Sequence, residues 1–472
     1  MSHRKPLLLS GLIGCLLLSS HVALALPQFA VRSARACDTC HVAPTGWHNP
    51  AISERKCTLN CNGCHVSPSG GGMRTASGSF YGQRTLPRWS RLPIDSLEIL
   101  SSSQPRAASQ PMAASQPMAA SQAKAASQPV ANQTAPAAGT AARYAGIEPN
   151  PTFQIGGDLR LAFFAPADDI AGGEGAFFPM QTDLYLAYRP YNPKALNHGR
   201  VTLVTSLGAQ GSREEEFDGF TDRFFAREWY AMYHDLPDQM YVRAGRFLPA
   251  HGWRTDDHTG FVRQGQMIFG QPFDHERQVT GLEFGMNPNY PYLHASVFNL
   301  ADDWDAPYDH QLGYGGALSA GYRELGWHTG ASVIYGQRET TDDQMGWTQV
   351  GASLQWALNL FVLANGLPLT YLGEYHLLHT SPDDQAKRIG LSSFHELGWL
   401  LTRGFNVTTR YDWNDPDIEF RYNTQHRINI GFEWHPVPFL EVITRFRHNW
   451  KHIDDRFKFD SDEVLVMLHG WY

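Results

Sequence analysis

Alternation of apolar and polar residues from Phe153 to Tyr472 constrains the fold of this chain more than any other feature. Two segments show the alternation clearly. In residues 427–434 one face would carry Ile428, Ile430, Phe432 and Trp434 and the other Arg427, Asn429, Gly431 and Glu433. In residues 440–447 one face would carry Leu440, Val442, Thr444 and Phe446 and the other Glu441, Ile443, Arg445 and Arg447. Side chains of an extended strand point alternately to opposite faces, so a period of two predicts strands lying between two different environments. The chain is therefore expected to be mainly β from Phe153 onward.

The connections between these segments alternate in length. Short turns are expected at His234–Asp238, Asn287–Pro291, Arg323–Gly326, Arg403–Phe405 and His435–Pro438, and longer acidic loops at Gly211–Asp222, Asp302–Asp309, Glu339–Asp343, Asp412–Asp417 and Asp454–Asp462. The last segment, Val464-x-Val466-x-Leu468-x-Gly470-x-Tyr472, resembles the terminal strand of outer-membrane barrel proteins. Loop asymmetry of this kind predicts a transmembrane antiparallel β-barrel of about sixteen strands. A large soluble β-protein explains the alternation but not the loops and the final aromatic strand together.

Composition agrees with a barrel and excludes some partners. Charged residues are 18% of the 472-residue chain, below the usual quarter, while aromatic residues reach 12%. Such a chain suits a barrel with an apolar outer surface and a polar lumen. The formal net charge of −8 argues against a nucleic-acid partner. A transmembrane barrel is expected to have outer-membrane lipid as its surroundings.

The chain divides into four parts. Residues 1–25 are expected to be a signal peptide, with a basic start, an apolar run from Leu7 and a small-residue cleavage site at Ala23-Leu24-Ala25. A signal anchor and a lipoprotein ending at Cys15 are the alternatives. Residues 26–97 form a small domain, 98–147 a disordered linker built on Ser-Gln-Pro-x-Ala-Ala repeats, and 148–472 the barrel.

The small domain carries two C-x-x-C-H motifs, Cys37-x-x-Cys40-His41 and Cys61-x-x-Cys64-His65. This spacing lets two thiols add to the vinyl groups of one haem while the adjoining histidine binds the iron. The motifs predict two covalently bound haem c groups, attached at the four cysteines and ligated by the two histidines. Zinc on the four cysteines, or two disulfides, are the alternatives.

Further ligand candidates are weaker. His48 and Met73 are the nearest residues able to fill the sixth iron positions. Cys57 has no obvious partner and is either a buried thiol or a link between chains. In the long connection Phe247–Gln278, His251, Asp256, Asp257 and His258 are alternatively metal ligands or ordinary loop residues. That connection is expected either to fold inward as a constriction or to lie on the surface.

The two C-x-x-C-H motifs, the lead-in from Leu26 to Arg32 and the barrel from Phe153 onward together resemble the fused cytochrome–porin family of outer-membrane electron-transfer proteins. The resemblance implies an outer-membrane location in a Gram-negative bacterium and electron exchange with an extracellular donor or acceptor. The best-known members are implicated in oxidising ferrous iron outside the cell. This chain differs from those members in having a second haem motif and a long repetitive linker.

Three functions follow from this reading. The first is an electron conduit between a periplasmic carrier, itself a c-type cytochrome, and an extracellular partner. The second is a porin with a tethered cytochrome that serves another enzyme, and the third a barrel with a zinc-binding structural domain. Lumen charges such as Arg410, Arg427, Glu433 and Arg445 either seat the haem domain or solvate the pore wall. No spacing of residues in the barrel indicates hydrolytic or transferase chemistry. The amino-terminal domain is expected to lie either in the periplasm or in the barrel lumen.

Overall fold

The computed structural model describes two parts of the chain. In the amino-terminal part it describes residues 61, 64–75, 78, 79, 82 and 86–89. From residue 152 to residue 472 it describes all but 167–174, 191–199, 210–223, 235, 254–259, 265–277, 289, 300–312, 324–326, 340–345, 361–367, 383–385, 403, 421 and 453–457. The signal peptide and the repeat linker expected from the sequence lie outside the described residues.

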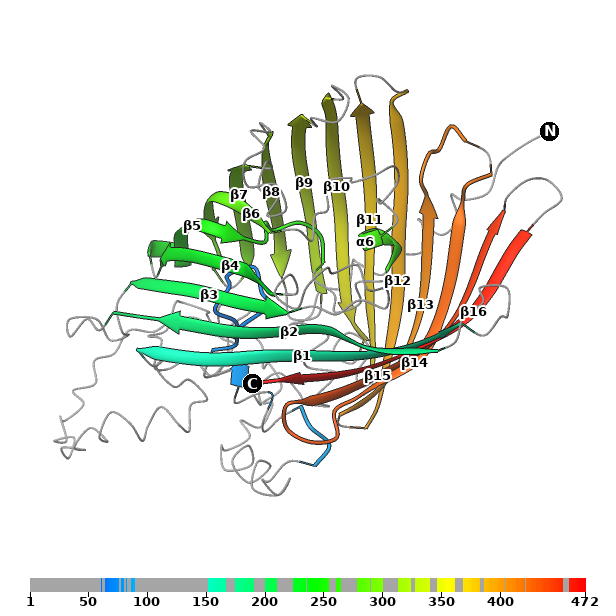
Figure 1. Ribbon diagram of the computed structural model, residues 1–472, viewed down its shortest axis with the longest axis horizontal. Helices are drawn as coiled ribbons and strands as arrows, with labels where there is room; N and C mark the ends of the chain where they lie inside the picture. Colours follow the sequence, from blue (N-terminus) through cyan, green and yellow to red (C-terminus); the bar gives the residue numbers. More distant parts are fainter. Residues whose placement is uncertain are drawn as a thin grey trace, which may run out of the picture.

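Sixteen antiparallel strands close into one barrel, which confirms the predicted fold class (Figure 1). Each strand pairs with its neighbours in the sequence, and β1 pairs with β16 to complete the ring. The strands are β1 (Phe153–Pro166), β2 (Ala176–Tyr188), β3 (Val201–Ala209), β4 (Phe224–Tyr233), β5 (Met240–Phe247), β6 (Val279–Met286), β7 (Pro291–Asn299), β8 (Gly313–Arg323), β9 (Trp327–Glu339), β10 (Gly346–Asn359), β11 (Leu369–Pro382), β12 (Arg388–Thr402), β13 (Phe405–Asp415), β14 (Gln425–Trp434), β15 (Leu440–His452) and β16 (Lys458–Trp471).

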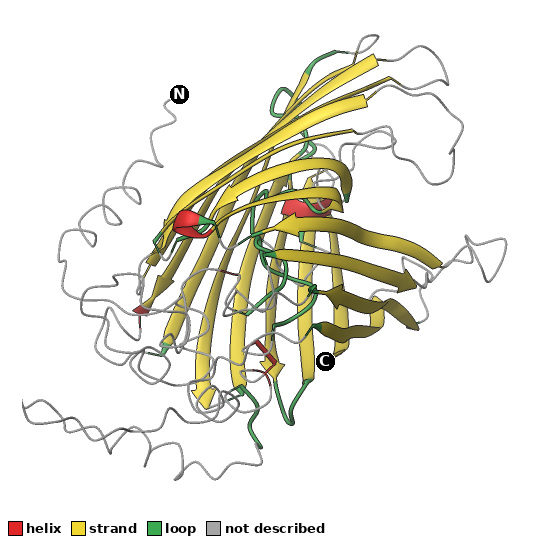
Figure 2. Ribbon diagram, turned by 90° about the vertical axis from the view of Figure 1, so that its left-hand side faces the viewer, coloured by secondary structure: helices red, strands yellow, loops and turns green. Residues whose placement is uncertain are grey.

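Helices are few in the described part of the chain. The 3-10 turn η6 (Pro237–Gln239) joins β4 to β5, and the helix α6 (Phe261–Gln264) belongs to the connection between β5 and β6. Figure 2 shows how little of the described chain is helical beside the tilted strands. No helix among the described residues has the length and apolar character needed to cross a membrane.

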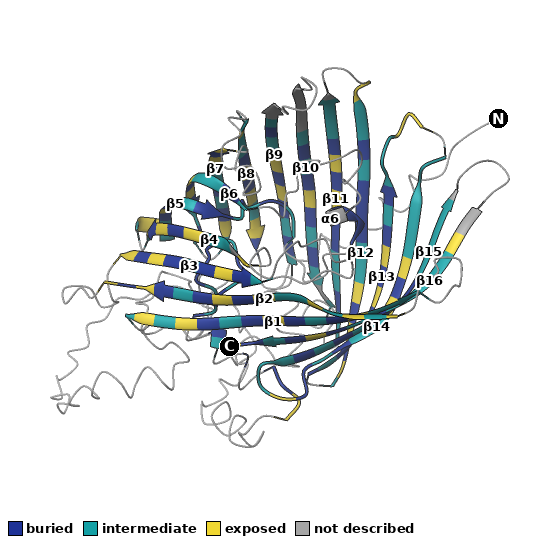
Figure 3. Cartoon of the chain, in the orientation of Figure 1, coloured by how far each residue is buried: buried dark blue, intermediate teal, exposed yellow. Residues whose placement is uncertain are grey.

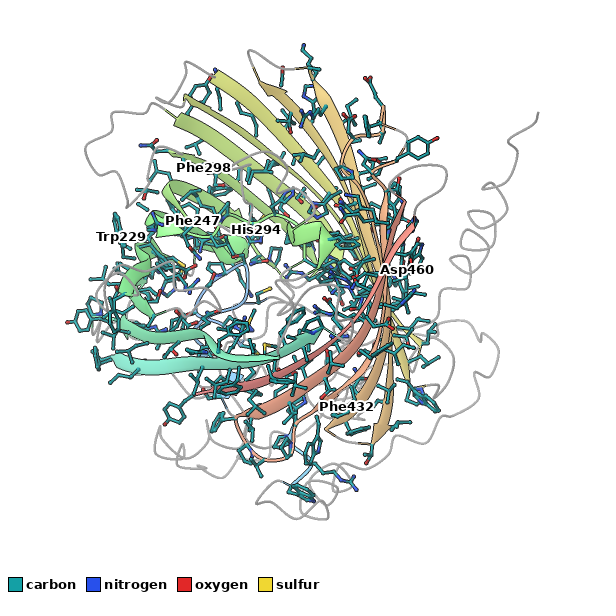
Figure 4. All side chains as sticks on the ribbon, turned by 45° about the vertical axis from the view of Figure 1, so that its right-hand side comes forward. Trp229, Phe247, His294, Phe298, Phe432 and Asp460 are labelled. Carbon is teal, nitrogen blue, oxygen red and sulfur yellow. The ribbon has the colours of Figure 1, made fainter. Side chains whose placement is uncertain are left out.

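Burial follows the predicted alternation along the strands (Figure 3). The side chains of Leu282 and Val297 are 55% and 63% exposed on the outer surface, whereas the lumen-facing Arg410 is 1% exposed. In Figure 4, Phe247 and His294 lie on the inner side of the wall, and Trp229 and Phe432 lie on the outer side. A closed ring with apolar side chains outside and polar ones inside is the arrangement of an outer-membrane barrel, because lipid satisfies no backbone hydrogen bonds.

A charge placed on the outer surface tests this assignment. Leu354 on β10 is 50% exposed on the apolar side of the wall. We expect Leu354→Arg to lower the free energy of unfolding in lipid vesicles by about 2–4 kcal/mol, because an arginine near the bilayer midplane is poorly solvated. The control Ile418→Arg, in the exposed connection after β13, should cost less than about 1 kcal/mol. Equal effects of the two substitutions in urea unfolding would contradict a hydrocarbon environment for β10.

Turn lengths separate the two ends of the barrel. Short connections such as 234–239, 287–290 and 435–439 lie at one end, called here the short-turn end, and the three longest connections, 210–223, 248–278 and 300–312, lie at the opposite end. Two predicted loops overlap strands by several residues. Asp412 lies within β13 and Asp462 within β16, because cross-strand pairing continues through both residues. Local acidity suggested loops there, but strand pairing overrides local preference.

Candidate functional site

The described residues between 61 and 89 enter the barrel, and they are called here the lumen segment (Figure 1, blue). It begins with a tight turn in which the amides of Cys64 and His65 donate to the Cys61 carbonyl oxygen at 3.1 and 2.8 Å. Both cysteines are partly exposed. The turn places the two thiols and the following imidazole on a single loop of backbone, which is the local geometry that C-x-x-C-H chemistry requires.

A small hairpin follows the turn. His65 pairs with Arg74, and the Val66 amide donates to the Met73 carbonyl oxygen at 2.9 Å. The chain reverses through Gly70, Gly71 and Gly72, which have φ angles of 89°, 73° and 58° that favour glycine. Since residues opposite each other in such a pair share a face, His65 and Arg74 lie on one face and Val66 and Met73 on the other.

The barrel wall holds this hairpin by polar contacts at the short-turn end. Asn287 Nδ2 donates to the Pro68 carbonyl oxygen at 2.8 Å, and Gln154 Nε2 donates to the Arg74 carbonyl oxygen at 2.5 Å. Met73 is 4% exposed and belongs to a buried apolar cluster with Val66 and Tyr185. The C-x-x-C-H turn therefore lies inside the lumen.

The lumen segment leaves the barrel over its short-turn rim. The amides of Arg88 and Trp89 donate to the carbonyl oxygens of His435 and Pro436 at 2.7 and 3.0 Å. The Trp89 ring lies edge-on to the Trp434 ring, with centroids 5.8 Å apart. These contacts fix the segment at a second place, on the turn between β14 and β15.

Arg243 on β5 is the most completely buried charged contact of the lumen segment. The side chain is 0% exposed, and its guanidinium lies 2.7 Å from Glu283 Oε1. It also donates to Ser67 Oγ at 3.4 Å and to the Leu248 carbonyl oxygen at 3.1 Å. Tyr241 donates to the same Glu283 oxygen at 2.6 Å. One buried arginine thus joins the barrel wall, the lumen segment and the start of the β5–β6 connection.

The described residues of the β5–β6 connection (248–253 and 260–264) fold inward and reach β9, β11 and β14, and we call them the inward loop. The Gly252 amide donates to Ser332 Oγ at 3.0 Å, and the Trp253 amide donates to the Glu374 carboxylate at 3.0 and 3.1 Å. Further on, Phe261 lies under the Arg427 guanidinium, 4.4 Å from its central carbon. The constriction expected as one of two alternatives is therefore the arrangement present.

Tyr292 on β7 connects the inward loop with the barrel wall. The Tyr292 hydroxyl lies 3.1 Å from His328 Nε2, and the His328 ring is edge-on to the Trp253 ring at 4.7 Å between centroids. The inward loop and the lumen segment meet at Arg243, whose guanidinium donates to Ser67 Oγ and to the Leu248 carbonyl oxygen.

The lumen charges singled out in the sequence face the lumen as expected. Arg445 lies 3.3 Å from Glu433 Oε1, and Arg410 lies 2.6 Å from Asp412 Oδ1. Arg427 packs against the inward loop. In the described contacts these residues pair with one another or meet the inward loop, so they favour wall solvation and loop seating over contact with the haem motif.

The structure places only part of the predicted haem site. Cys61, Cys64, His65 and Met73 are described, whereas Cys37, Cys40, His41, His48 and Cys57 lie outside the described residues, as do Asp256, Asp257 and His258. The His251 ring is edge-on to the His376 ring at 5.3 Å between centroids. Among the described residues, no three His, Cys, Asp or Glu side chains are grouped to hold a metal ion. The ligation of haem iron stays a prediction.

The donor set at the described turn fits a haem c group. Two thiols follow each other at the required spacing on a turn that is only partly exposed, and His65 is the next residue. The residues missed from the sequence are Arg243, Glu283 and Tyr292. Alternation places all three on the inner face, but it does not reveal that Arg243 meets Ser67 from the amino-terminal part.

Comparisons with known proteins concern the barrel. No known protein family and no curated protein sequence matches this chain. An anion-selective porin from Comamonas acidovorans is similar in structure at 12% identity and a TM-score of 0.49, over 68% of this chain and 99% of the porin. Outer-membrane OmpT of Vibrio cholerae is similar at 9% identity and a TM-score of 0.49, over 68% and 97%. The outer membrane channel DcaP of Acinetobacter baumannii is similar at 12% and 0.45, over 68% and 97%.

Proposed function

We propose that this outer-membrane barrel conducts electrons between a periplasmic carrier and an extracellular donor or acceptor through two covalently attached haem c groups. The observation that carries the proposal is the position of the Cys61–His65 turn: its hairpin is held at the barrel wall by Asn287 and Gln154, and by Arg243, which also meets the inward loop. A haem attached there stands within the membrane-spanning wall, where no soluble carrier can enter.

The chain supplies the binding and the surroundings of this cofactor. Cys61 and Cys64 provide the thioether sulfurs, and His65 provides the proximal imidazole. Bound haem supplies a one-electron couple of the iron. Val66 and Met73 anchor the hairpin in the wall, while Arg243 connects it to the inward loop. Filling the lumen with protein around the site excludes water and separates the redox chemistry from both solvents.

Orientation follows from the loops. Short turns of such barrels face the periplasm and long loops face the outside, so the short-turn end with the lumen segment faces the periplasm. A periplasmic c-type cytochrome is then the partner at the rim near Trp89, and the long-loop end meets the extracellular partner. Ferrous iron is the external donor that the family resemblance suggests.

Pore conduction with a tethered cytochrome is the second candidate, because the inward loop resembles a pore constriction in its path from β5 to the wall around β9 and β11. The two candidates differ in whether electrons or solutes cross. In the conduit, the lumen segment and the inward loop occupy the same space that solutes would need.

Reconstitution in sealed lipid vesicles tests the proposal. Haem-loaded protein should pass electrons from an external reductant to an impermeant acceptor dye enclosed in the vesicles, whereas protein produced without haem attachment should not. Release of small enclosed sugars should stay at the rate of protein-free vesicles. Sugar release without dye reduction by the haem-loaded protein would instead support the tethered-cytochrome porin.

A further inference from the structure

A buried chain of carboxylates and imidazoles crosses the seam where the barrel closes. Asp158 Oδ2 on β1 lies 3.0 Å from His469 Nε2 on β16, and His469 Nδ1 lies 3.1 Å from Glu441 Oε2 on β15. Glu441 Oε1 lies 3.2 Å from Nε2 of His435, in the turn between β14 and β15. None of the four side chains is more than 5% exposed. We call this group the seam relay.

The hydrogen bonds of the seam relay require one proton more than neutral imidazoles and ionised carboxylates would hold. A carboxylate only accepts hydrogen bonds, so each contact needs a proton on the nitrogen or on the carboxyl group. His469 faces a carboxylate through both ring nitrogens, so these two contacts hold one proton more than a neutral imidazole carries. His435 uses Nε2 toward Glu441. Its Nδ1 faces no carboxylate of the relay, so a proton held there would leave the contact between Nε2 and Glu441 intact.

The relay lies next to the lumen segment. Arg74, the residue opposite His65 in the hairpin, places its guanidinium 4.8 Å from the centre of the Trp471 ring. That ring lies 5.0 Å from the His469 ring and 5.9 Å from the His435 ring. Arg74 also interacts electrostatically with Asp158. Arg74, which pairs with His65 in the hairpin, therefore links the hairpin to Asp158, the first carboxylate of the relay.

Other charged and titratable groups surround the relay. Arg160 Nε lies 3.4 Å from Asp158 Oδ1, and Tyr185 and Asp183 face Asp158 from β2. At the far end the amide of Arg88 donates to the His435 carbonyl oxygen. Histidine is the side chain of this cluster whose ordinary pKa lies near neutral pH, so the two imidazoles are the candidate proton acceptors.

The relay is not needed to close the barrel. Backbone pairing already joins β1 to β16 from Asp158 to Pro166, and β16 to β15 from Leu440 to His452. Buried ionic groups contribute little stability compared with apolar side chains of similar volume. Four titratable side chains at one buried place are therefore better explained by proton binding than by a role in stabilising the pairing of β1, β16 and β15.

We propose that the seam relay is a proton-uptake site coupled to the oxidation state of the haem on Cys61 and Cys64, an inference that rests on the proposed function. When a periplasmic or external reductant gives one electron to the iron, the buried region gains one negative charge. A proton from water then forms an N–H bond at Nδ1 of His435 and restores the charge. The relay transmits this coupling because unlike charges attract strongly where water is excluded.

Potentiometric titration of the purified full-length holoprotein between pH 5 and pH 9 tests the relay. The midpoint potential of one haem should fall with rising pH by up to about 59 mV for each tenfold drop in proton concentration. In Glu441→Gln and His469→Gln this slope should disappear for the same haem. The control His395→Gln alters a histidine bonded to Tyr371 on the outer face of β12, and it should keep the slope.

A second measurement needs no substitution. Reduction of the wild-type holoprotein in weakly buffered solution should raise the pH by an amount that approaches one proton per electron near neutral pH. Potentials of both haems that stay constant with pH, or a slope that persists in both relay variants, would overturn the relay and leave the conduit standing. A wild-type protein without a Soret band would overturn the conduit and the relay together.

Discussion

Replacing Cys61 and Cys64 together with alanine should lower the Soret absorbance per chain by about half, because one of two covalent haem sites is lost. Without thioether bonds only the His65–iron bond would hold that haem, and detergent purification removes it. Electron transfer into vesicles should fall to the rate of protein-free vesicles, since under the proposed function the lost haem is the one attached to the turn inside the lumen. Absorption spectra, haem-stained gels and the vesicle assay measure these effects.

Cys57 offers a matched control, because it is a cysteine of the same region outside both motifs. Cys57→Ala should keep the full Soret absorbance and the full transfer rate. The barrel of the double variant should still assemble, because its strand pairing involves none of these cysteines. An unchanged Soret band in the double variant, together with stoichiometric zinc in the wild-type protein, would show that the motif cysteines bind zinc instead.

Arg243→Met should have the largest effect on stability, lowering the free energy of unfolding by about 3–5 kcal/mol, because it leaves a buried carboxylate without its cation. Glu283 is 1% exposed and would keep only the neutral Tyr241 hydroxyl as a donor. The lumen segment and the inward loop would both lose a contact as well, at Ser67 and at the Leu248 carbonyl oxygen. Urea unfolding in lipid vesicles, followed by tryptophan fluorescence, measures the change.

The double variant Arg243→Met/Glu283→Gln separates charge from packing. Removing the carboxylate charge should recover more than half of the lost stability, because the neutral amide no longer needs a buried cation. If the double variant is as unstable as Arg243→Met, the arginine acts through its packing over Phe247, 4.2 Å from the ring centre, and not through Glu283.

Much of the barrel could be predicted from the sequence, because the alternation of apolar and polar residues that marks a strand lies within that strand. The alternation around Ile428–Trp434 gave the correct faces of β14, and Phe153 was the correct first residue of β1. The predicted loop boundaries were wrong where acidic residues suggested a loop. Asp412 and Asp462 are of this kind, but both pair with residues of a neighbouring strand. Pairing energy comes from the neighbouring strand, which a local pattern does not contain.

The sequence by itself determined that this chain is a closed sheet with an apolar outside, since a period of two and unequal loops leave few other ways to bury it. It also supplied the two cysteine motifs and their chemistry. Only the tertiary structure decided that the Cys61–His65 turn lies inside the barrel and that Arg243 joins the nearby Ser67 to the start of the β5–β6 connection. Those placements depend on contacts such as Arg243 with Ser67, between residues 176 positions apart. Short-range patterns carry no information about such distant partners.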